Sequence, residues 1–144
     1  MFCNRGAGHM TYALSHSLQT AVYQHLMADA ALAAEVGTAI YDMLPSGSLP
    51  GLYVTLGAES VRDRSDVTGG GALHRFTVTV VANAAGFSAA KRAAAAVSDA
   101  LVDAPLTLAR GRLVGLWFDR ATAKRLSNGD RSIALRFSAR LEDS

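Results

Sequence analysis

The side chains in this sequence that could bind a metal or transfer a proton are four histidines: His9, His16, His25 and His74. His16 and His25 lie nine positions apart on a segment with helical periodicity, so they face nearly opposite directions. Metal ligands on one helix are typically about three or four residues apart. Neither His74 nor His9 has an Asp or Glu arranged to complete a site. The sequence therefore predicts no metal site, and it predicts that His25, which falls among apolar positions, is a partly buried side chain with a satisfied hydrogen bond.

Nucleophilic catalysis has little support in the sequence. Ser60, His74 and Asp63 could be combined into a triad, but a chain with this many serines permits such a choice anywhere, and no G-x-S-x-G elbow is present. Cys3, the single cysteine, lies in an N-terminal leader and cannot form an internal disulfide. We therefore expect no catalytic residue and no cofactor.

A polar stretch after position 58 ends in three glycines. The glycines lack the G-x-x-x-x-G-K-[ST] pattern, and a strand rather than a helix is expected after them, so they are interpreted as a hairpin tip and not as a phosphate-binding loop. Alternating charges before the tip indicate mixed-sign contacts or a solvated edge. We treat the stretch as a candidate oligomer or tail-tube interface, formed by Arg62, Asp63, Arg64, Asp66, Gly69, Gly70 and Gly71.

Basic residues are concentrated in the C-terminal part of the chain. Arg136 and Arg140 are expected to share one face of a strand with Ser132 and Ser138, because even numbers of residues separate the four positions. The others are expected to cluster around the last hairpin, either in solvent or facing an oligomer lumen or a protein partner. No aromatic residues are interleaved for base stacking, so sequence-specific nucleic-acid recognition is not supported. This second candidate set is Arg110, Arg112, Arg120, Lys124, Arg125 and Arg131.

Length and composition indicate one globular domain. The chain has 144 residues, of which 50% are hydrophobic and 18% charged, a balance that argues against disorder. The net charge is +2, with no long run of like charges, so an anionic partner is permitted but not required. No apolar run reaches the ~18 residues of a membrane span, so no membrane partner is expected. We interpret residues 1–10 as a flexible leader and 11–144 as a single domain.

The N-terminal half alternates between helical and strand patterns. Apolar residues at spacings of three and four predict a helix from a Thr11 cap to Ala28. Asp29 is expected to cap a short helical turn over Ala30–Glu35. Short strands are expected over Thr38–Met43 and Leu52–Gly57, with a possible strand extension over Ser60–Val67.

The C-terminal half contains the clearest strands. Alternation predicts strands at Leu73–Asn83, Leu113–Ala121 and Ser132–Leu141, with a turn over Ser127–Asp130. Between the first two, a helix is expected to start at a Ser88 cap and to end at Pro105. The order of elements predicts an α+β fold, a mostly antiparallel sheet with two main helices packed on one face. The positions expected to point inward are uniformly apolar: Phe76, Val78 and Val80; Val114, Leu116 and Phe118; Ile133, Leu135 and Phe137.

Motifs spread over residues 13–142 resemble the small tail completion proteins of long-tailed phages, also called tail terminators or tail-to-head joining proteins. The motifs are individually weak, and their order and spacing carry the resemblance. They comprise Leu18, Ala21, Val22, Tyr23 and Leu26 with Asp29–Leu32 on the first helix; Ile40-Tyr41-Asp42, Pro45 and Tyr53–Gly57 around the first strands; His74–Ala82; the alanine-rich helix Ser88–Leu101; and Phe137, Ala139 and Glu142 at the end.

This resemblance implies a structural role in a virion or phage-like tail. Such proteins form a ring, usually a hexamer, on the head-proximal end of the tail tube. The ring stops tube polymerisation and joins the tail to the head-completion, or stopper, protein at the neck. DNA passes through its centre without sequence-specific binding. The implied partners are therefore copies of the chain itself, the tail tube protein and the neck protein. The host particle could be a phage, a prophage, a tail-like bacteriocin or a gene transfer agent.

Two other functions remain open from the residues alone. A small-molecule enzyme or binding domain would need a pocket between helix and sheet, lined by polar residues at inward positions. The apolar inward positions favour a filled core instead. A bacterial regulator or toxin partner would form a stable dimer that does not bind a tail tube.

Overall fold

The computed structural model describes residues 14–42, 47, 49–63, 72–83, 85–102 and 104–142. The strands in this part of the chain form one five-stranded sheet in the order β1-β2-β3-β5-β4. β1 and β2 pair in parallel, and the other neighbours pair antiparallel. The expected α+β fold with a mostly antiparallel sheet is therefore confirmed. The elements are α1 (Ser15–Ala28), α2 (Ala30–Val36), β1 (Ile40–Tyr41), β2 (Leu52–Asp63), β3 (Ala72–Ala82), α3 (Phe87–Leu101), β4 (Arg112–Arg125) and β5 (Arg131–Glu142).

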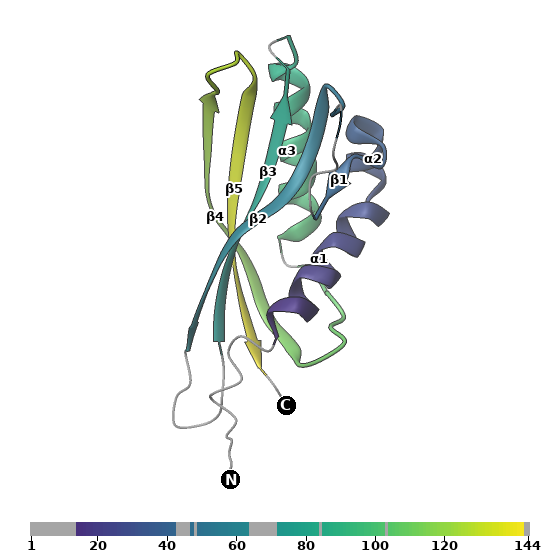
Figure 1. Cartoon of the computed structure of the whole chain (residues 1–144). Coiled ribbons are helices and arrows are strands. Elements are labelled where there is room, and N and C mark those ends of the chain that lie inside the picture. Colours follow the sequence, from purple (N-terminus) through teal and green to yellow (C-terminus); the bar gives the residue numbers. More distant parts are fainter. Residues whose placement is uncertain are drawn as a thin grey trace.

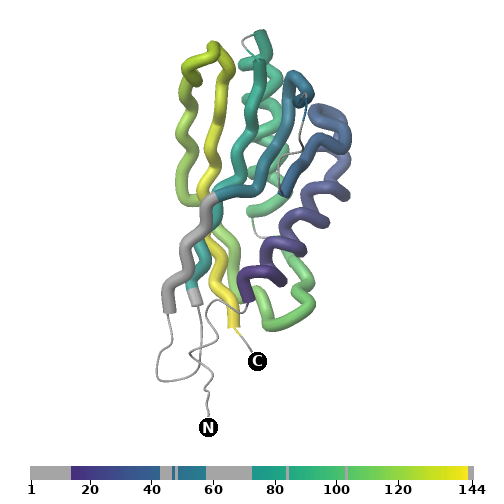
Figure 2. Tube along the Cα trace, viewed as in Figure 1, coloured from purple at the N-terminus to yellow at the C-terminus, as the bar shows by residue number. Residues whose placement is uncertain are grey.

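The helices cover one face of a strongly twisted sheet, as Figure 1 shows. Helix α3 packs on β3 and β5, while α1 and α2 lie toward the β1–β2 side. The chain path in Figure 2 places the start of α1 and the end of β5 at one end of the molecule, opposite the β4–β5 turn. One sheet face is therefore buried under helices, and the other, which we call the open face, is free of them within the described residues.

The core lies between the helices and the covered face. The alternation expected for β3 and β5 is observed, and the stripe expected on α3 points inward. Small alanines on α3 let the helix approach the sheet closely. The largest side chain with no exposed surface is Phe137, which stacks on Phe76 with 5.6 Å between ring centroids. Predicted inward positions that are buried are Leu18, Val22 and Leu26; Phe76, Val78, Val80 and Ala82; Ala90, Ala94, Val97 and Leu101; and Leu116, Ile133, Leu135, Phe137, Ala139 and Leu141.

Helix starts agree with the sequence only in part. The Asp29 carboxylate accepts a hydrogen bond from the Leu32 amide at 2.9 Å, so the predicted cap of α2 is present. The predicted Ser88 cap is wrong: α3 begins at Phe87 after Gly86, and no side chain caps it. The Ser88 hydroxyl instead accepts from Arg92 at 3.2 Å, one turn along the helix. The predicted Thr11 cap lies outside the described residues.

Strand lengths differ from the prediction in both directions. β1 has only two residues because its single partner, β2, pairs with it only at Ile40 and Tyr41. β2 is one strand to Asp63, where the sequence suggested a short strand and a separate extension, and its pairing with β3 shifts register between Gly57 and Glu59. β4 runs to Arg125, four residues further than expected, since β5 pairs with it along its whole length. The turn that joins them is therefore short.

The strand whose facing differs most from the sequence prediction is β4. Leu116 and Phe118 lie opposite Ala139 and Phe137 and face inward, as expected, although Phe118 on this edge strand is 42% exposed. Val114, which was expected to face inward with them, is 46% exposed. The pairing with β5 shifts between Leu113 and Gly115 and again between Phe118 and Arg120. Each such bulge inserts an extra residue, so strict alternation along the strand is lost.

Candidate functional site

The histidines do not assemble a catalytic or metal site in the described part of the chain. His25 lies on α1 with its Nε2 2.8 Å from the Ala100 carbonyl oxygen, as expected for a satisfied side chain. His74 is fully buried on β3, and His16 is exposed on α1. Ser60 pairs with Arg75, whereas His74 pairs with Val61, so the sheet does not align the proposed triad. Within the described residues no three His, Cys, Asp or Glu side chains converge as metal ligands.

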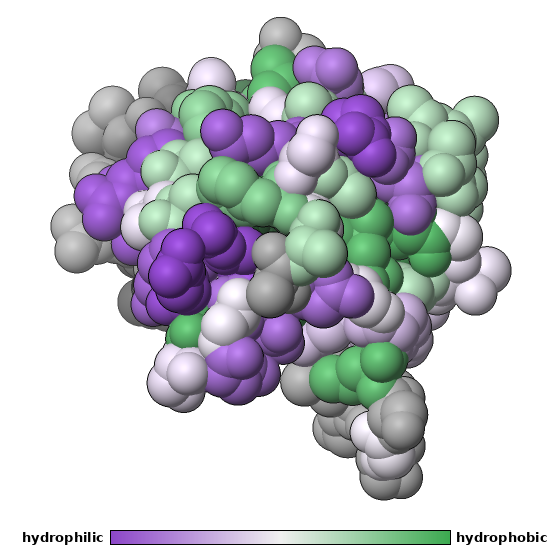
Figure 3. Space-filling model, turned by 90° about the horizontal axis from the view of Figure 1, so that it is seen from above, coloured by the Kyte–Doolittle hydropathy of each residue, from purple (hydrophilic) through white to green (hydrophobic). Residues whose placement is uncertain are grey.

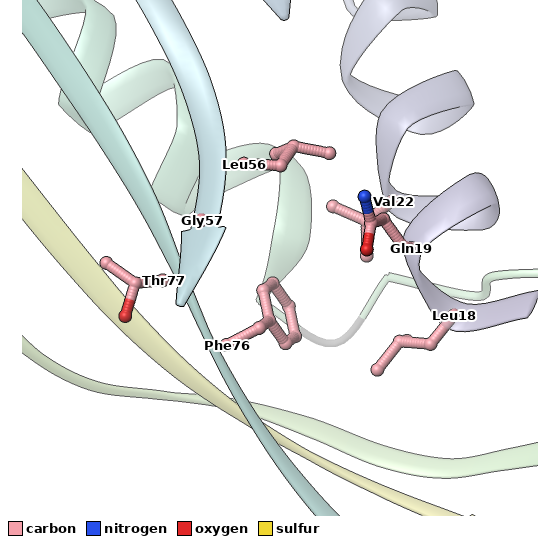
Figure 4. Close-up of a pocket in the computed structure, with 7 residues that line it drawn as sticks. All are labelled: Leu18, Gln19, Val22, Leu56, Gly57, Phe76 and Thr77. Carbon is pink, nitrogen blue, oxygen red and sulfur yellow. The ribbon is translucent and has the colours of Figure 1, made fainter. Parts of the chain in front are cut away.

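The space between helix α1 and the sheet is nearly filled. A hollow of about 20 Å³ lies among Leu18 and Val22 of α1 and Leu56 and Phe76 of the sheet, with Gln19 at its rim (Figure 4). That volume accommodates about one water molecule. The alternative function, a small-molecule enzyme or binding domain, would need a pocket at this place. No pocket of ligand size lies between α1 and the sheet in the described residues.

A wider groove of about 350 Å³ lies between α1 and the segment before β4. It is lined by mostly uncharged side chains, and His16 is the single imidazole among them. A single exposed imidazole has no partner there to act as a matched acid and base. The groove therefore offers a surface rather than a reaction centre. Its lining is His16, Ser17, Thr20, Ala21, Gln24, Thr107, Leu108 and Ala109.

Two members of the first candidate interface fall within the described residues. Arg62 and Asp63 form the last residues of β2, paired with Leu73 and Ala72 of β3. The remaining members, Arg64, Asp66, Gly69, Gly70 and Gly71, lie outside the described residues. The role of this hairpin in assembly stays a prediction.

The second candidate set does not form one cluster. Arg112 begins β4 and pairs with the Glu142 carboxylate, and Arg110 lies just before it. Lys124, Arg125 and Arg131 lie at the opposite end of the 14-residue strand, around the turn to β5. At about 3.3 Å per residue the two ends are roughly 40 Å apart. The expectation of a single basic cluster around the hairpin is therefore wrong, because β4 is longer than the sequence pattern indicated.

The strand register brings several cations together on the open face. Arg136 lies between Thr77 of β3 and Arg120 of β4, and Lys124 is opposite Ser132. The register also places Arg136 and Arg140 on the same face as Ser132 and Ser138, as predicted. Asp119, in the second bulge, accepts a hydrogen bond from the Ser138 hydroxyl at 2.5 Å. The open face is thus polar and mainly basic.

Aromatic side chains accompany these cations on β4. Trp117 is 47% exposed, and its ring lies against Gly115, where an added Cβ would come within 2.9 Å of the indole. Phe118 meets Phe137 edge to face, with 5.7 Å between centroids, and leaves 42% of its surface exposed. Because β4 is the last strand of the sheet, these side chains form an exposed edge. We call Val114, Trp117, Phe118, Arg120, Lys124 and Arg125 the β4 edge.

The opposite edge of the molecule has the opposite charge. Residues 14–61, which form α1, α2, β1 and most of β2, contain no Lys or Arg and four carboxylates. Residues 104–142 contain eight Lys or Arg and three carboxylates. The concentration of basic residues in the C-terminal part was visible in the sequence, and a count of Lys and Arg over residues 14–61 would also have shown the acidic segment, which the net charge of +2 conceals. We call Asp29, Glu35 and Asp42, with α2 and β1, the acidic side.

Charged side chains also lie at the end of the molecule that carries the β4–β5 turn. Hydrophilic and hydrophobic residues are interspersed on this surface (Figure 3). Arg131 lies over the Phe87 ring, 4.9 Å from its centroid, so this basic residue of the turn has a cation–π partner within the subunit.

Partial burial, and then the negative charge of Asp130, raise the pKa of Tyr53 above its ordinary value of 10.0. Tyr53 is therefore neutral at physiological pH.

Comparison with known proteins identifies relatives of this arrangement. A family model described as tail completion protein gp17 matches residues 20–142. Among solved structures, a chain of the "Virion of native gene transfer agent (GTA) particle" is 60% identical, with a TM-score of 0.86 over 92% of this chain and 99% of that chain. No curated protein matches the sequence. None of the described helices is long and apolar enough to span a lipid bilayer.

Proposed function

Because this chain belongs to the tail completion protein gp17 family, a group of structural tail components, we propose that it forms a homo-oligomeric ring at the head-proximal end of a phage-type tail tube. The ring ends tube polymerisation and connects the tail to the neck. Family membership confirms the resemblance stated from the sequence. Family membership alone does not establish the ring, its hexameric copy number or its partners, and these are part of the proposal.

The observation that carries the proposal is the match to the gene transfer agent virion. At 60% identity the two chains are close homologues, and that chain is covered over 99% of its length. The proposed host particle is therefore one of the gene transfer agent type. The proposed partners are the tail tube protein and the head-completion protein, and DNA passes through the lumen without base contacts. A polar, basic open face without a stacking array is compatible with such a passage.

The fold also suits a ring with two different contact surfaces. A heterologous, head-to-tail interface needs two complementary patches on each subunit. The molecule has a basic, apolar edge on one side of its sheet and an acidic side on the other. A reaction centre is not part of the proposal, since the described residues supply neither a matched acid and base nor a ligand-sized pocket under the helices.

The decisive experiment removes the protein from the particle. We expect a producing strain without the gene to make overlong tubes or tails without heads, as seen by negative-stain electron microscopy. Restoring the gene should restore tails of normal length joined to heads. Normal joined particles in its absence would contradict the proposal. A stable dimer that does not bind the tail tube protein would instead favour the alternative of a bacterial regulator or toxin partner.

A separate test addresses the β2–β3 hairpin. Deleting Gly69, Gly70 and Gly71 should leave a folded subunit, because the core residues of β2 and β3, such as Val54 and Val78, are retained, but should impair ring or tube assembly. Circular dichroism reports the fold, and mass measurement with and without tube protein reports assembly. Unchanged assembly would remove the hairpin from the interface without touching the ring itself.

A further inference from the structure

We propose that the β4 edge of one copy docks, through its side chains, on the acidic side of the next copy. The contact would join the basic and apolar strand at one limit of the sheet to α2 and β1 at the other. This inference rests on the proposed ring, and it names the surfaces that close it.

The first argument is that the cations of the β4 edge are not neutralised within the subunit. Arg120 is directly opposite Arg136, and Arg125 is opposite Arg131. Like charges at directly opposite positions destabilise a sheet. In the described residues, Arg120, Lys124 and Arg125 have no carboxylate within ion-pair distance. An anionic partner would offset this repulsion.

The second argument is that the same edge is apolar. Val114, Trp117 and Phe118 are each more than two-fifths exposed and lie beside the cations. Exposed Trp and Phe together with Arg are typical of the centres of protein interfaces. A surface that contacts only the DNA backbone needs the cations but not the apolar side chains. The mixture favours a protein partner.

The third argument concerns how the edge can make contact. Two bulges interrupt the pairing of β4 with β5, and charged side chains lie along β4. Both features discourage the direct addition of another strand to a sheet edge. Docking therefore occurs through side chains, with Trp117 next to Gly115 and Phe118 edge to face with Phe137.

The fourth argument identifies the partner as a second copy. The sheet order places β1 and β4 at opposite edges, which Figure 1 shows on opposite sides of the molecule. On the β1 edge, Asp42 is exposed, and among the described residues it is bound by the neutral amide of Gln19 alone. Asp29 carries its charge at the start of α2, and Glu35 pairs with Arg92 at 3.3 Å. Complementary charges on opposite sides of one subunit allow repeated head-to-tail contact.

Charge reversal tests this pairing. The edge variant carries Arg120→Glu and Lys124→Glu, and the side variant carries Glu35→Lys and Asp42→Lys. Each should raise the concentration needed for self-association at least about tenfold, because like charges would then face each other. A matched control, Arg75→Glu with Lys91→Glu, makes the same change in net charge as the edge variant at residues that belong to neither surface, and it should associate like the wild type. Circular dichroism confirms that each variant is folded.

Combining the reversals distinguishes an interface from a damaged subunit. A chain carrying all four substitutions has both surfaces inverted, so it should recover association to within about tenfold of the wild type. Mixing the edge and side variants should give an oligomer that neither forms alone. Failure of both rescues with folded chains would overturn the proposal.

Two further outcomes separate the alternatives. If the edge variant associates like the wild type but is no longer retained on mixed-sequence double-stranded DNA, the β4 edge serves DNA and the proposal is wrong. If the wild type stays monomeric, alone and with the tail tube protein, the ring itself fails and this interface with it. A wild-type oligomer that all reversals leave unchanged would overturn only the interface.

Discussion

At the scale of single residues, Phe137 is the side chain on which the core depends most. It has no exposed surface, stacks on Phe76 and meets Phe118 edge to face. We expect Phe137→Ala to lower the free energy of unfolding by about 3–5 kcal/mol, since it removes a buried ring and leaves a cavity. Urea unfolding at a fixed protein concentration measures this, because association also contributes to apparent stability. Phe118→Ala is the control and should cost less than half as much, and equal losses would contradict the assignment of Phe137 to the centre of the core.

Two glycines that are equally crowded should respond differently to the same substitution. At Gly111 an added Cβ would lie 2.9 Å from the Glu142 carbonyl oxygen, and the backbone φ is +80°. At Gly115 it would lie 2.9 Å from the end of the Trp117 ring. A main-chain oxygen cannot move aside and a positive φ strains alanine, so Gly111→Ala should cost about 2 kcal/mol or more.

Gly115→Ala provides the matched comparison for that substitution. The Trp117 side chain can rotate away, so the cost should stay below about 1 kcal/mol. Trp117 is the only tryptophan in the chain, so its fluorescence reports the displacement directly. An unchanged emission spectrum would show that the ring does not rest on Gly115.

At the scale of elements, α2 depends on its first residue. Helix α2 has seven residues, and its two buried side chains, Leu32 and Val36, attach it to the core. The Asp29 carboxylate satisfies the Leu32 amide at its start. Asp29→Ala should therefore cost about 1 kcal/mol, whereas Asp29→Asn, which keeps an accepting oxygen, should cost much less. Thermal unfolding of both variants measures the difference, and an equal loss would assign the effect to charge rather than to capping.

The strands show which elements could be predicted from the sequence. β3 and β5 lie inside the sheet and pair on both sides, so their alternation survives and Phe76, Val78, Ile133 and Leu135 were correctly expected inside. β4 pairs on one side only, and two bulges shift its facing residues. Bulges depend on how two strands meet, which periodicity along one strand does not contain. The edge that carries the proposed interface was therefore the part that alternation described least well.

At the scale of the whole molecule, charge was predictable as a total but not as an arrangement. A net charge of +2 suggested no strong electrostatic partner. The fold separates a segment without cations, at the β1 edge, from a segment with eight, at the β4 edge. Sequence order alone did not place these segments at opposite limits of one sheet. Sheet topology converts a nearly neutral chain into a polar subunit, which is the property that a head-to-tail assembly needs.

From this separation of charge we predict how self-association depends on salt concentration. If the contact between copies depends on Arg120 and Lys124 facing carboxylates, raising NaCl from about 0.05 M to about 0.5 M should weaken self-association, because screening shortens the range of exposed charges. The urea midpoint of the isolated subunit should change far less, since its core is apolar. Mass measurement across the salt series checks the first point and unfolding checks the second. Association that strengthens with salt would instead assign the contact to the exposed Val114, Trp117 and Phe118, because excluded salts favour apolar burial.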